Sequence, residues 1–123
     1  MSKKVALVGH CGPDGSYLRS AVTGAVRGTS VMMIDEADRL EKALSDGVDL
    51  ILMNRQLDWG FDTDEGVELI RKLRLSHPNV KFMLVSNYPE AQQEAIAAGA
   101  LPGFGKREIG TAKVVDLLKS ALE

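Results

Sequence analysis

The sequence predicts an α/β protein in which a doubly wound parallel sheet carries helices on both faces. Two observations lead to this prediction. Short, uninterrupted apolar segments recur along the chain, and segments with apolar residues at helical spacing separate them. Uninterrupted apolar strands are typical of parallel sheets that are buried on both faces. Strands that alternate with helices through right-handed crossovers then place helices on both sides of the sheet.

Four apolar segments predict buried strands, because none of them alternates polar with apolar residues. These segments cover residues 5–8, 31–34, 50–53 and 82–85. A fifth segment, residues 101–104, is interrupted by Pro102 and Gly103. Proline cannot donate a hydrogen bond within a sheet, so we expect the fifth strand to lie at an edge.

A helix is predicted after each strand, because apolar residues recur there at spacings of three and four. The first residues of these five apolar stripes are Tyr17, Ala37, Val67, Ala91 and Ile109. Glycine or proline follows each of the first four stripes and ends the helix, at Gly28, Gly47, Pro78 and Gly99.

Length and composition indicate one soluble globular domain that spans residues 1–123. The chain is 45% hydrophobic and 26% charged, as is usual for this class. A net charge of −2 with scattered basic residues argues against binding to nucleic acid or anionic membranes. No apolar run is long enough for a membrane span or a signal peptide. The single cysteine, Cys11, excludes an internal disulfide, and we expect a cytoplasmic protein.

Polar residues directly after the predicted strands form the candidate functional site. Open parallel sheets bind ligands beyond the carboxyl ends of their strands. The residues at these positions are Gly9, His10, Asp35, Asn54, Ser86, Gly105 and Lys106. Loops of any α/β protein are polar, so the chemistry of these residues must decide what the site does.

Several segments, taken in order, resemble the receiver domain of response regulators in two-component signalling. They are residues 5–8, 18–22, 49–54, 66–70, 82–86, 98–100 and Lys106. The resemblance covers essentially the whole chain and implies the strand order 2-1-3-4-5. A working receiver accepts a phosphoryl group on an aspartate that ends its third strand, with Mg²⁺ held by two acidic residues after the first strand. A serine or threonine after the fourth strand and a lysine after the fifth bind the phosphoryl oxygens.

This sequence departs from the receiver pattern at the residues that carry the chemistry. The phosphoacceptor position is Asn54, and a neutral amide is not a carboxylate nucleophile. Gly9 and His10 replace the acidic pair, so the oxygen ligands that Mg²⁺ prefers are missing. Ser86 and Lys106 match the pattern. We therefore expect no catalysis and no cofactor, Mg²⁺ included.

Two further departures concern the switch region. Arg107 stands where proline usually follows the lysine, and the switch aromatic is expected at Gly103, with Phe104 one place late. Without the acidic pair, the Lys106 ammonium needs another partner, because an unpaired cation at a partly buried site is costly. Candidate partners are the amide oxygen of Asn54, a backbone carbonyl and a bound anion, and we favour Asn54.

The segment after the third strand, residues 55–65, is longer than in the receiver pattern. It carries Trp59 and Phe61 among four acidic residues. These aromatic side chains either fold back over the strand ends or stand exposed as anchors for a partner. Trp59, Phe61 and Phe104 are therefore our candidate residues for partner binding.

The function that these residues favour is phosphorylation-independent signalling by a pseudo-receiver. Its partner would be a signalling protein or other domains of a larger regulator. A second copy of the chain, bound through the fourth and fifth helices, is an alternative partner.

Two alternatives use the segment from Gly9 to Ser16. Its glycines could let backbone N–H groups bind a small anion or a nucleotide at a helix N-terminus. Otherwise the segment is a plain turn with Asp14 or Ser16 as N-cap. A cysteine phosphatase using Cys11 is disfavoured, because Arg19 comes two places too late for the phosphate loop of that class.

Overall fold

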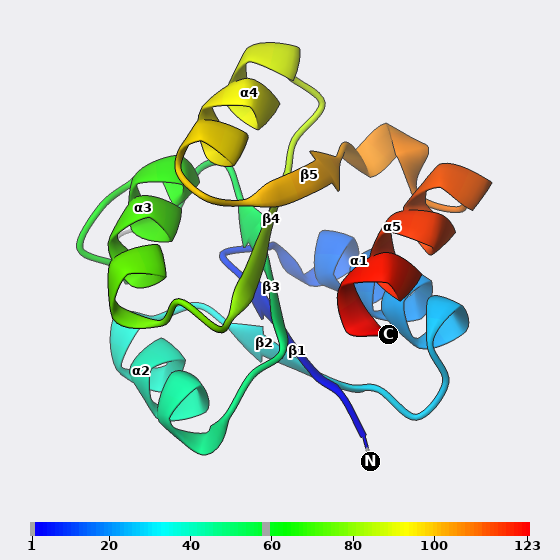
Figure 1. Ribbon diagram of the computed structural model, residues 1–123, viewed down its shortest axis with the longest axis horizontal. Helices are drawn as coiled ribbons and strands as arrows, with labels where there is room; N and C mark the ends of the chain where they lie inside the picture. Colours follow the sequence, from blue (N-terminus) through cyan, green and yellow to red (C-terminus); the bar gives the residue numbers. More distant parts are fainter. Residues whose placement is uncertain (1, 58–59) are drawn as a thin grey trace.

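The computed structural model describes residues 2–57 and 60–123, and its strands and helices alternate as predicted (Figure 1). The strands are β1 (Lys4–Val8), β2 (Ser30–Ile34), β3 (Leu50–Asn54), β4 (Lys81–Val85) and β5 (Leu101–Phe104). The helices are α1 (Gly12–Ala25), α2 (Ala37–Asp46), α3 (Gly66–Ser76), α4 (Pro89–Ala97) and α5 (Ala112–Leu122), with a short 3₁₀ helix, η1 (Lys106–Glu108), before α5.

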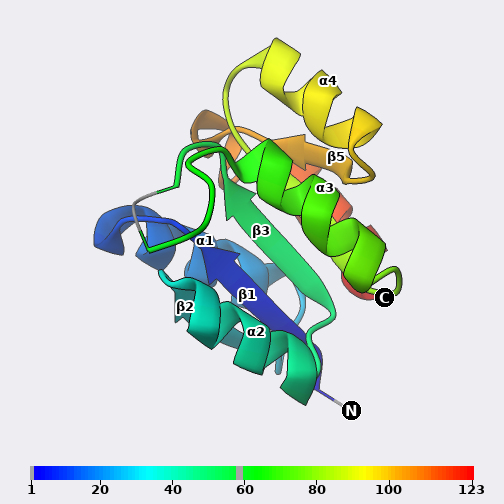
Figure 2. The ribbon, with the colours of Figure 1, turned by 90° about the vertical axis from the view of Figure 1, so that its left-hand side faces the viewer.

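The strands form one parallel sheet in the order β2-β1-β3-β4-β5, which confirms the predicted fold class. Helices α2, α3 and α4 pack on one face, and α1 and α5 pack on the other (Figures 1 and 2). The sheet order reverses between β1 and β3, so the carboxyl ends of these two strands flank the crevice where this architecture binds ligands.

Two apolar cores explain why the strands do not alternate polar with apolar residues. Ala6 and Val8 of β1 pack in the core beneath α2, α3 and α4, whereas Val5 and Leu7 pack in the core beneath α1 and α5. All four side chains are fully buried. Successive residues of a strand point to opposite faces, so a strand covered on both faces must be apolar throughout.

β5 lies at an edge of the sheet, as Pro102 led us to expect, and its pairing with β4 is irregular. Met83 pairs with Leu101 and Val85 with Phe104, so the register shifts between these pairs. The side chain of Gln92, on α4, bridges this irregularity. Its Nε2 donates to the carbonyls of Leu84 (2.9 Å) and Ser86 (3.1 Å), and its Oε1 accepts from Gly103 N–H (3.2 Å).

The first helix starts earlier than predicted. The segment from Gly9 to Ser16 was expected to be a loop, but α1 begins at Gly12, after Cys11 as N-cap. Asp14 and Ser16 therefore lie inside the helix, and the prediction that one of them caps it is wrong. Pro13 accounts for the difference, because its fixed φ suits the first turn and its missing N–H is not needed there.

The last helix, by contrast, starts later than predicted. The apolar stripe pointed to Ile109, but this residue follows η1, and Gly110 (φ 97°) turns the chain before α5 begins at Ala112. In the described part of the chain, no helix combines the length and the apolar character needed to cross a membrane.

Candidate functional site

The predicted strand-end residues come together around a small cavity at the carboxyl edge of the sheet. The cavity has a volume of about 150 Å³ and is lined by Asn54, Arg55, Gln56, Val85, Ser86, Asn87, Tyr88 and Lys106. The structure thus brings together three of the five predicted pocket residues. Gly9 and His10 lie beside this group without lining the cavity.

The amide of Asn54 is held by two backbone carbonyls. Its Nδ2 donates to the carbonyl of Gly9 (3.1 Å) and to that of Gln56 (2.9 Å). Both partners are acceptors, so this orientation of the amide is fixed by the network. A carboxylate at this position would place one of its oxygens, in place of Nδ2, against both carbonyls. The local backbone is therefore built for an amide and would repel the anionic side chain of a phosphoacceptor.

Lys106 pairs with an acidic residue that the sequence analysis assigned to a turn. Its Nζ lies 2.7 Å from Oδ2 of Asp14, with about a third of each side chain exposed. This hydrogen bond lowers the pKa of the Asp14 carboxyl below its usual range. The expected contact of Lys106 with Asn54 is wrong, because α1 starts at Gly12 and its first turn presents Asp14 to the lysine. A carboxylate in the first helical turn is also favoured by the helix dipole.

His10 is buried and neutral. Its side chain is 8% exposed, and Nε2 lies 2.8 Å from the carbonyl of Leu52, which can only accept. Nε2 therefore carries the proton, and the buried Nδ1 has no hydrogen-bond partner among the described residues. Burial lowers the pKa of His10; the bond to Leu52 partly offsets this, and nearby Lys106 lowers it further. The ring fills a space at the end of the sheet and offers no charge there.

The two positions that hold Mg²⁺ in a working receiver do not fit that ion here. Gly9 has φ 79°, a left-handed conformation that disfavours any side chain. A Cβ at Gly9 would also clash with Leu57, whose buried side chain covers this position. Residues 2–57 and 60–123 contain no group of three metal-ligating side chains placed to share an ion. An apolar contact and a neutral imidazole thus stand where hard oxygen ligands would be needed.

Ser86 keeps the place that the receiver pattern gives it. Its side chain is buried, and its Oγ accepts the N–H of Tyr88 (3.1 Å) at the start of α4. The hydroxyl proton of Ser86 has no acceptor among the described residues, so it can be donated into the cavity.

Two of the three aromatic candidates, Phe61 and Phe104, are buried. Phe61 is only 9% exposed and packs in the core beneath α2, α3 and α4, so it folds back, but into the core. Phe104 is 1% exposed and packs in the opposite core. Neither residue is therefore an exposed anchor, because both rings pack in the apolar layers on either side of the sheet. Trp59, the third candidate, lies outside the described residues.

Cys11 is an exposed free thiol at the N-cap of α1. Arg19, the cation considered for a phosphatase loop, donates from Nη1 to the carbonyl of Val31 in β2 (3.0 Å). This bond directs the guanidinium to the sheet edge, so the arginine does not close a phosphate loop around the thiol.

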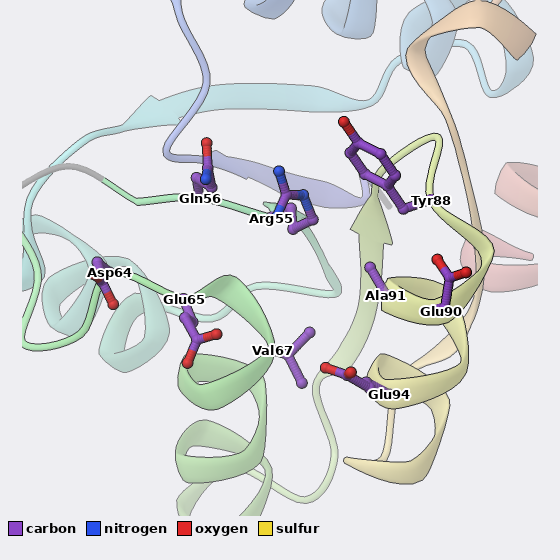
Figure 3. A pocket seen from close by; sticks show the side chains of 9 residues that line it. All are labelled: Arg55, Gln56, Asp64, Glu65, Val67, Tyr88, Glu90, Ala91 and Glu94. Atoms are coloured by element: carbon purple, nitrogen blue, oxygen red, sulfur yellow. The ribbon is translucent and has the colours of Figure 1, made fainter.

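A larger groove adjoins the cavity and was missed by the sequence analysis. It has a volume of about 650 Å³ and lies between the first turns of α3 and α4 (Figure 3). Its lining consists of Arg55, Gln56, Asp64, Glu65, Val67, Tyr88, Glu90, Ala91 and Glu94. The guanidinium of Arg55 lies over the ring of Tyr88, 4.7 Å from its centroid. The one feature of the sequence that could have indicated this groove is an aromatic residue, Tyr88, directly before the proline that opens α4.

Comparison with known proteins identifies the fold. No protein-family model matches the chain, and no curated protein matches it either. Solved structures do match. The receiver domain of NtrX from Brucella abortus has a TM-score of 0.72 at 22% identity, over 96% of this chain and 97% of that one. A response regulator from Thermotoga maritima has a TM-score of 0.74 at 19% identity, over 98% of both chains.

A longer NtrX structure matches with a TM-score of 0.75 at 21% identity, over 99% of this chain and 27% of that one. The present chain thus spans about a quarter of that protein. These similarities show that the chain has the receiver fold, and they show that such domains also occur inside larger proteins.

Proposed function

We propose that this domain is a phosphorylation-independent signalling module, which uses the receiver fold to bind another protein and catalyses no phosphoryl transfer. The observation that carries the proposal is the bonding of Asn54. Both hydrogens of its amide are committed to backbone carbonyls, of Gly9 and Gln56, at the position where a receiver needs a free carboxylate.

Three neighbouring groups support the same proposal. Lys106, which binds phosphoryl oxygens in a receiver, is already neutralised by Asp14. Leu57 covers the position of the first acidic residue, and the neutral ring of His10 fills the second. We therefore propose that the domain needs no Mg²⁺ or other cofactor. We also propose a cytoplasmic location, because an exposed, unpaired cysteine such as Cys11 suits a reducing compartment.

The position of the switch aromatic also departs from the receiver pattern. The switch aromatic position is Gly103, and a Cβ there would clash with the carbonyl of Leu84 and with Gln92. Gln92 instead joins α4, β4 and β5 through its amide. We propose that this bridge holds the α4–β5 face in one arrangement, so that partner binding does not depend on a modification.

Intact-mass spectrometry tests the absence of phosphorylation. The wild-type chain and Asn54→Asp are each incubated with acetyl phosphate and Mg²⁺, beside a working receiver as positive control. We expect no added phosphoryl group on either chain, since Asn54→Asp restores the nucleophile but not the metal ligands. A phosphoryl group on the wild-type chain would disprove the proposal, and one on Asn54→Asp would disprove the account of the metal site.

A second candidate function, binding of a small anion at the strand ends, is favoured by the composition of the cavity. Arg55, Lys106 and the Ser86 hydroxyl all line it. An anion would have to replace Asp14 as the partner of Lys106. Thermal unfolding with phosphate or sulfate tests this, because a ligand of the native state raises the melting temperature. The increase must disappear in Lys106→Gln.

A further inference from the structure

We infer that the groove between the first turns of α3 and α4 is a docking site for an arginine-rich segment of a protein partner. This inference rests on the proposed function and names the surface and the class of partner. It is carried by three observations on the groove: its shape, its unpaired carboxylates and an aromatic face that already holds a guanidinium.

The shape is that of a trough with an apolar floor. Val67, of α3, is buried, and Ala91, of α4, is half-buried; both line the groove. Glu94 extends from α4 toward Val67, and Glu65 lies at the start of α3 (Figure 3). A volume of about 650 Å³ accommodates several side chains of an extended or helical segment. Apolar and charged contacts are thus available in the same groove.

The carboxylates of the groove are not neutralised from within the described structure. Asp64, Glu65, Glu90 and Glu94 all line it, and none of them forms an ion pair with a described residue. Dipoles of the two helices favour Glu65 and Glu90, which stand at the helix starts. Asp64 precedes α3 and Glu94 lies in the second turn of α4, so the dipoles do not account for these two.

Tyr88 provides an independent indication of the ligand. It is 57% exposed, and one face of its ring holds the guanidinium of Arg55. Among the described residues, Arg55 is the only cation that lines the groove, and four carboxylates against one guanidinium leave a strongly negative surface. An aromatic face beside carboxylates is the environment that arginine prefers, since guanidinium stacks on rings and binds carboxylates in pairs.

The carboxylates of the groove favour several separate cations over one shared metal ion. Within residues 2–57 and 60–123, no three acidic side chains approach closely enough to share a metal. Four acids spread along a trough instead match arginines spread along a segment. A polyanion such as nucleic acid would be repelled by the same charges.

Fluorescence anisotropy with a labelled peptide tests the inference. The probe is a short alanine-based peptide with arginines at helical spacing, and its control has glutamine in place of each arginine. The chain is compared with a groove variant, Glu65→Gln/Glu94→Gln, and with a matched variant on α2, Asp38→Asn/Glu41→Gln. Both variants lose two negative charges at exposed sites, so they carry the same net charge.

We expect the arginine peptide to bind the wild-type chain and the glutamine peptide not to bind. The groove variant should weaken binding about tenfold, as expected for two lost charge pairs, and the α2 variant by less than about twofold. Tyr88→Ala should also weaken binding at about 300 mM salt, where charge attraction is screened. Absence of binding, or equal loss in both charge variants, would overturn the inference.

Repeating the titration after incubation with acetyl phosphate and Mg²⁺ separates this inference from the proposed function. Binding that appears only after this treatment would support the groove and refute phosphorylation independence. Absence of binding under both conditions would refute the groove alone, while the mass-spectrometric test of Asn54 still decides the proposed function.

Discussion

Replacing Gln92 with leucine tests the bridge between α4, β4 and β5. The Gln92 amide has two N–H groups, which serve Leu84 and Ser86 at 2.9 and 3.1 Å, and a longer contact of 3.4 Å reaches Phe104. Its oxygen accepts from Gly103. Leucine has a similar volume but no polar atoms, so these backbone groups lose their partner while packing is largely retained.

Loss of three well-formed hydrogen bonds, at about 1 kcal/mol each, would lower the free energy of unfolding by at most about 3 kcal/mol. Gln92 and Gly103 are half-buried, so water can form some of the hydrogen bonds that the leucine variant loses. We therefore expect Gln92→Leu to lower the free energy of unfolding by about 2 kcal/mol. For a domain of this size, that corresponds to a decrease of about 8 °C in melting temperature.

Urea unfolding followed by circular dichroism measures the change. Gln93→Leu is the matched control, because Gln93 is the same residue type, one place along α4, but exposed and without a described side-chain hydrogen bond. Gln92→Glu provides a second test. A carboxylate cannot donate to carbonyl oxygens, so this variant should be destabilised at neutral pH and should recover as the pH falls and the new carboxyl is protonated. Loss of less than about 0.5 kcal/mol in Gln92→Leu would refute the bridge.

Three further predictions concern single residues. The bond from Lys106 lowers the pKa of Asp14 in the folded state. The pair should therefore stabilise the fold at pH values above the ordinary pKa of an aspartate, and this stabilisation should be lost as the pH falls through the lowered pKa of the folded state. Asp14→Asn should abolish that acid dependence in urea titrations and cost about 0.5–1 kcal/mol at pH 7, since the pair is one-third exposed. Burial lowers the pKa of His10, so the fold should lose stability as the pH drops below about 6.5. ¹⁵N NMR should show a ring protonated on Nε2 alone at pH 7, and a doubly protonated ring there would contradict the account. A homodimer through α4 and α5 would bury Ile96, which is 47% exposed on α4. Ile96→Glu should therefore convert such a dimer to monomers, as measured by analytical ultracentrifugation. A dimer that persists in this variant would show that another face forms the contact.

The sheet was predictable because burial on both faces leaves a local signature in the strands. Each apolar segment could be interpreted without knowing its neighbours, and the interruption by Pro102 and Gly103 placed the fifth strand at an edge. The substituted site was equally visible, since Asn54 and Gly9 occupy positions that the receiver pattern fixes. What each substituted residue contacts was not visible, because those contacts join residues far apart in the chain.

The partner of Lys106 illustrates this limit. An error of a few residues in the start of α1 moved Asp14 from a turn to the first turn of a helix, and this changed its role. The burial of Phe61 and Phe104 has a similar origin. Aromatic side chains in loops resemble binding residues in a sequence, but the space beside the sheet decides whether they pack inward. The groove was missed for a related reason, because its walls come from two segments that meet only in the fold.

The changes at the strand ends form one connected set. An amide at Asn54 donates to the backbone at Gly9, where a receiver has an acidic residue. The left-handed backbone of Gly9 in turn leaves space for Leu57, from the long loop after β3. Restoring an aspartate at Asn54 would therefore break a bond to Gly9, and restoring one at Gly9 would displace Leu57. Under our proposal, conversion to a phosphorylatable receiver would require several simultaneous changes, each unfavourable alone. This connected set supports our proposal that the receiver fold serves here as a binding surface, and we therefore place the partner in the groove beside Asn54 rather than at Asn54 itself.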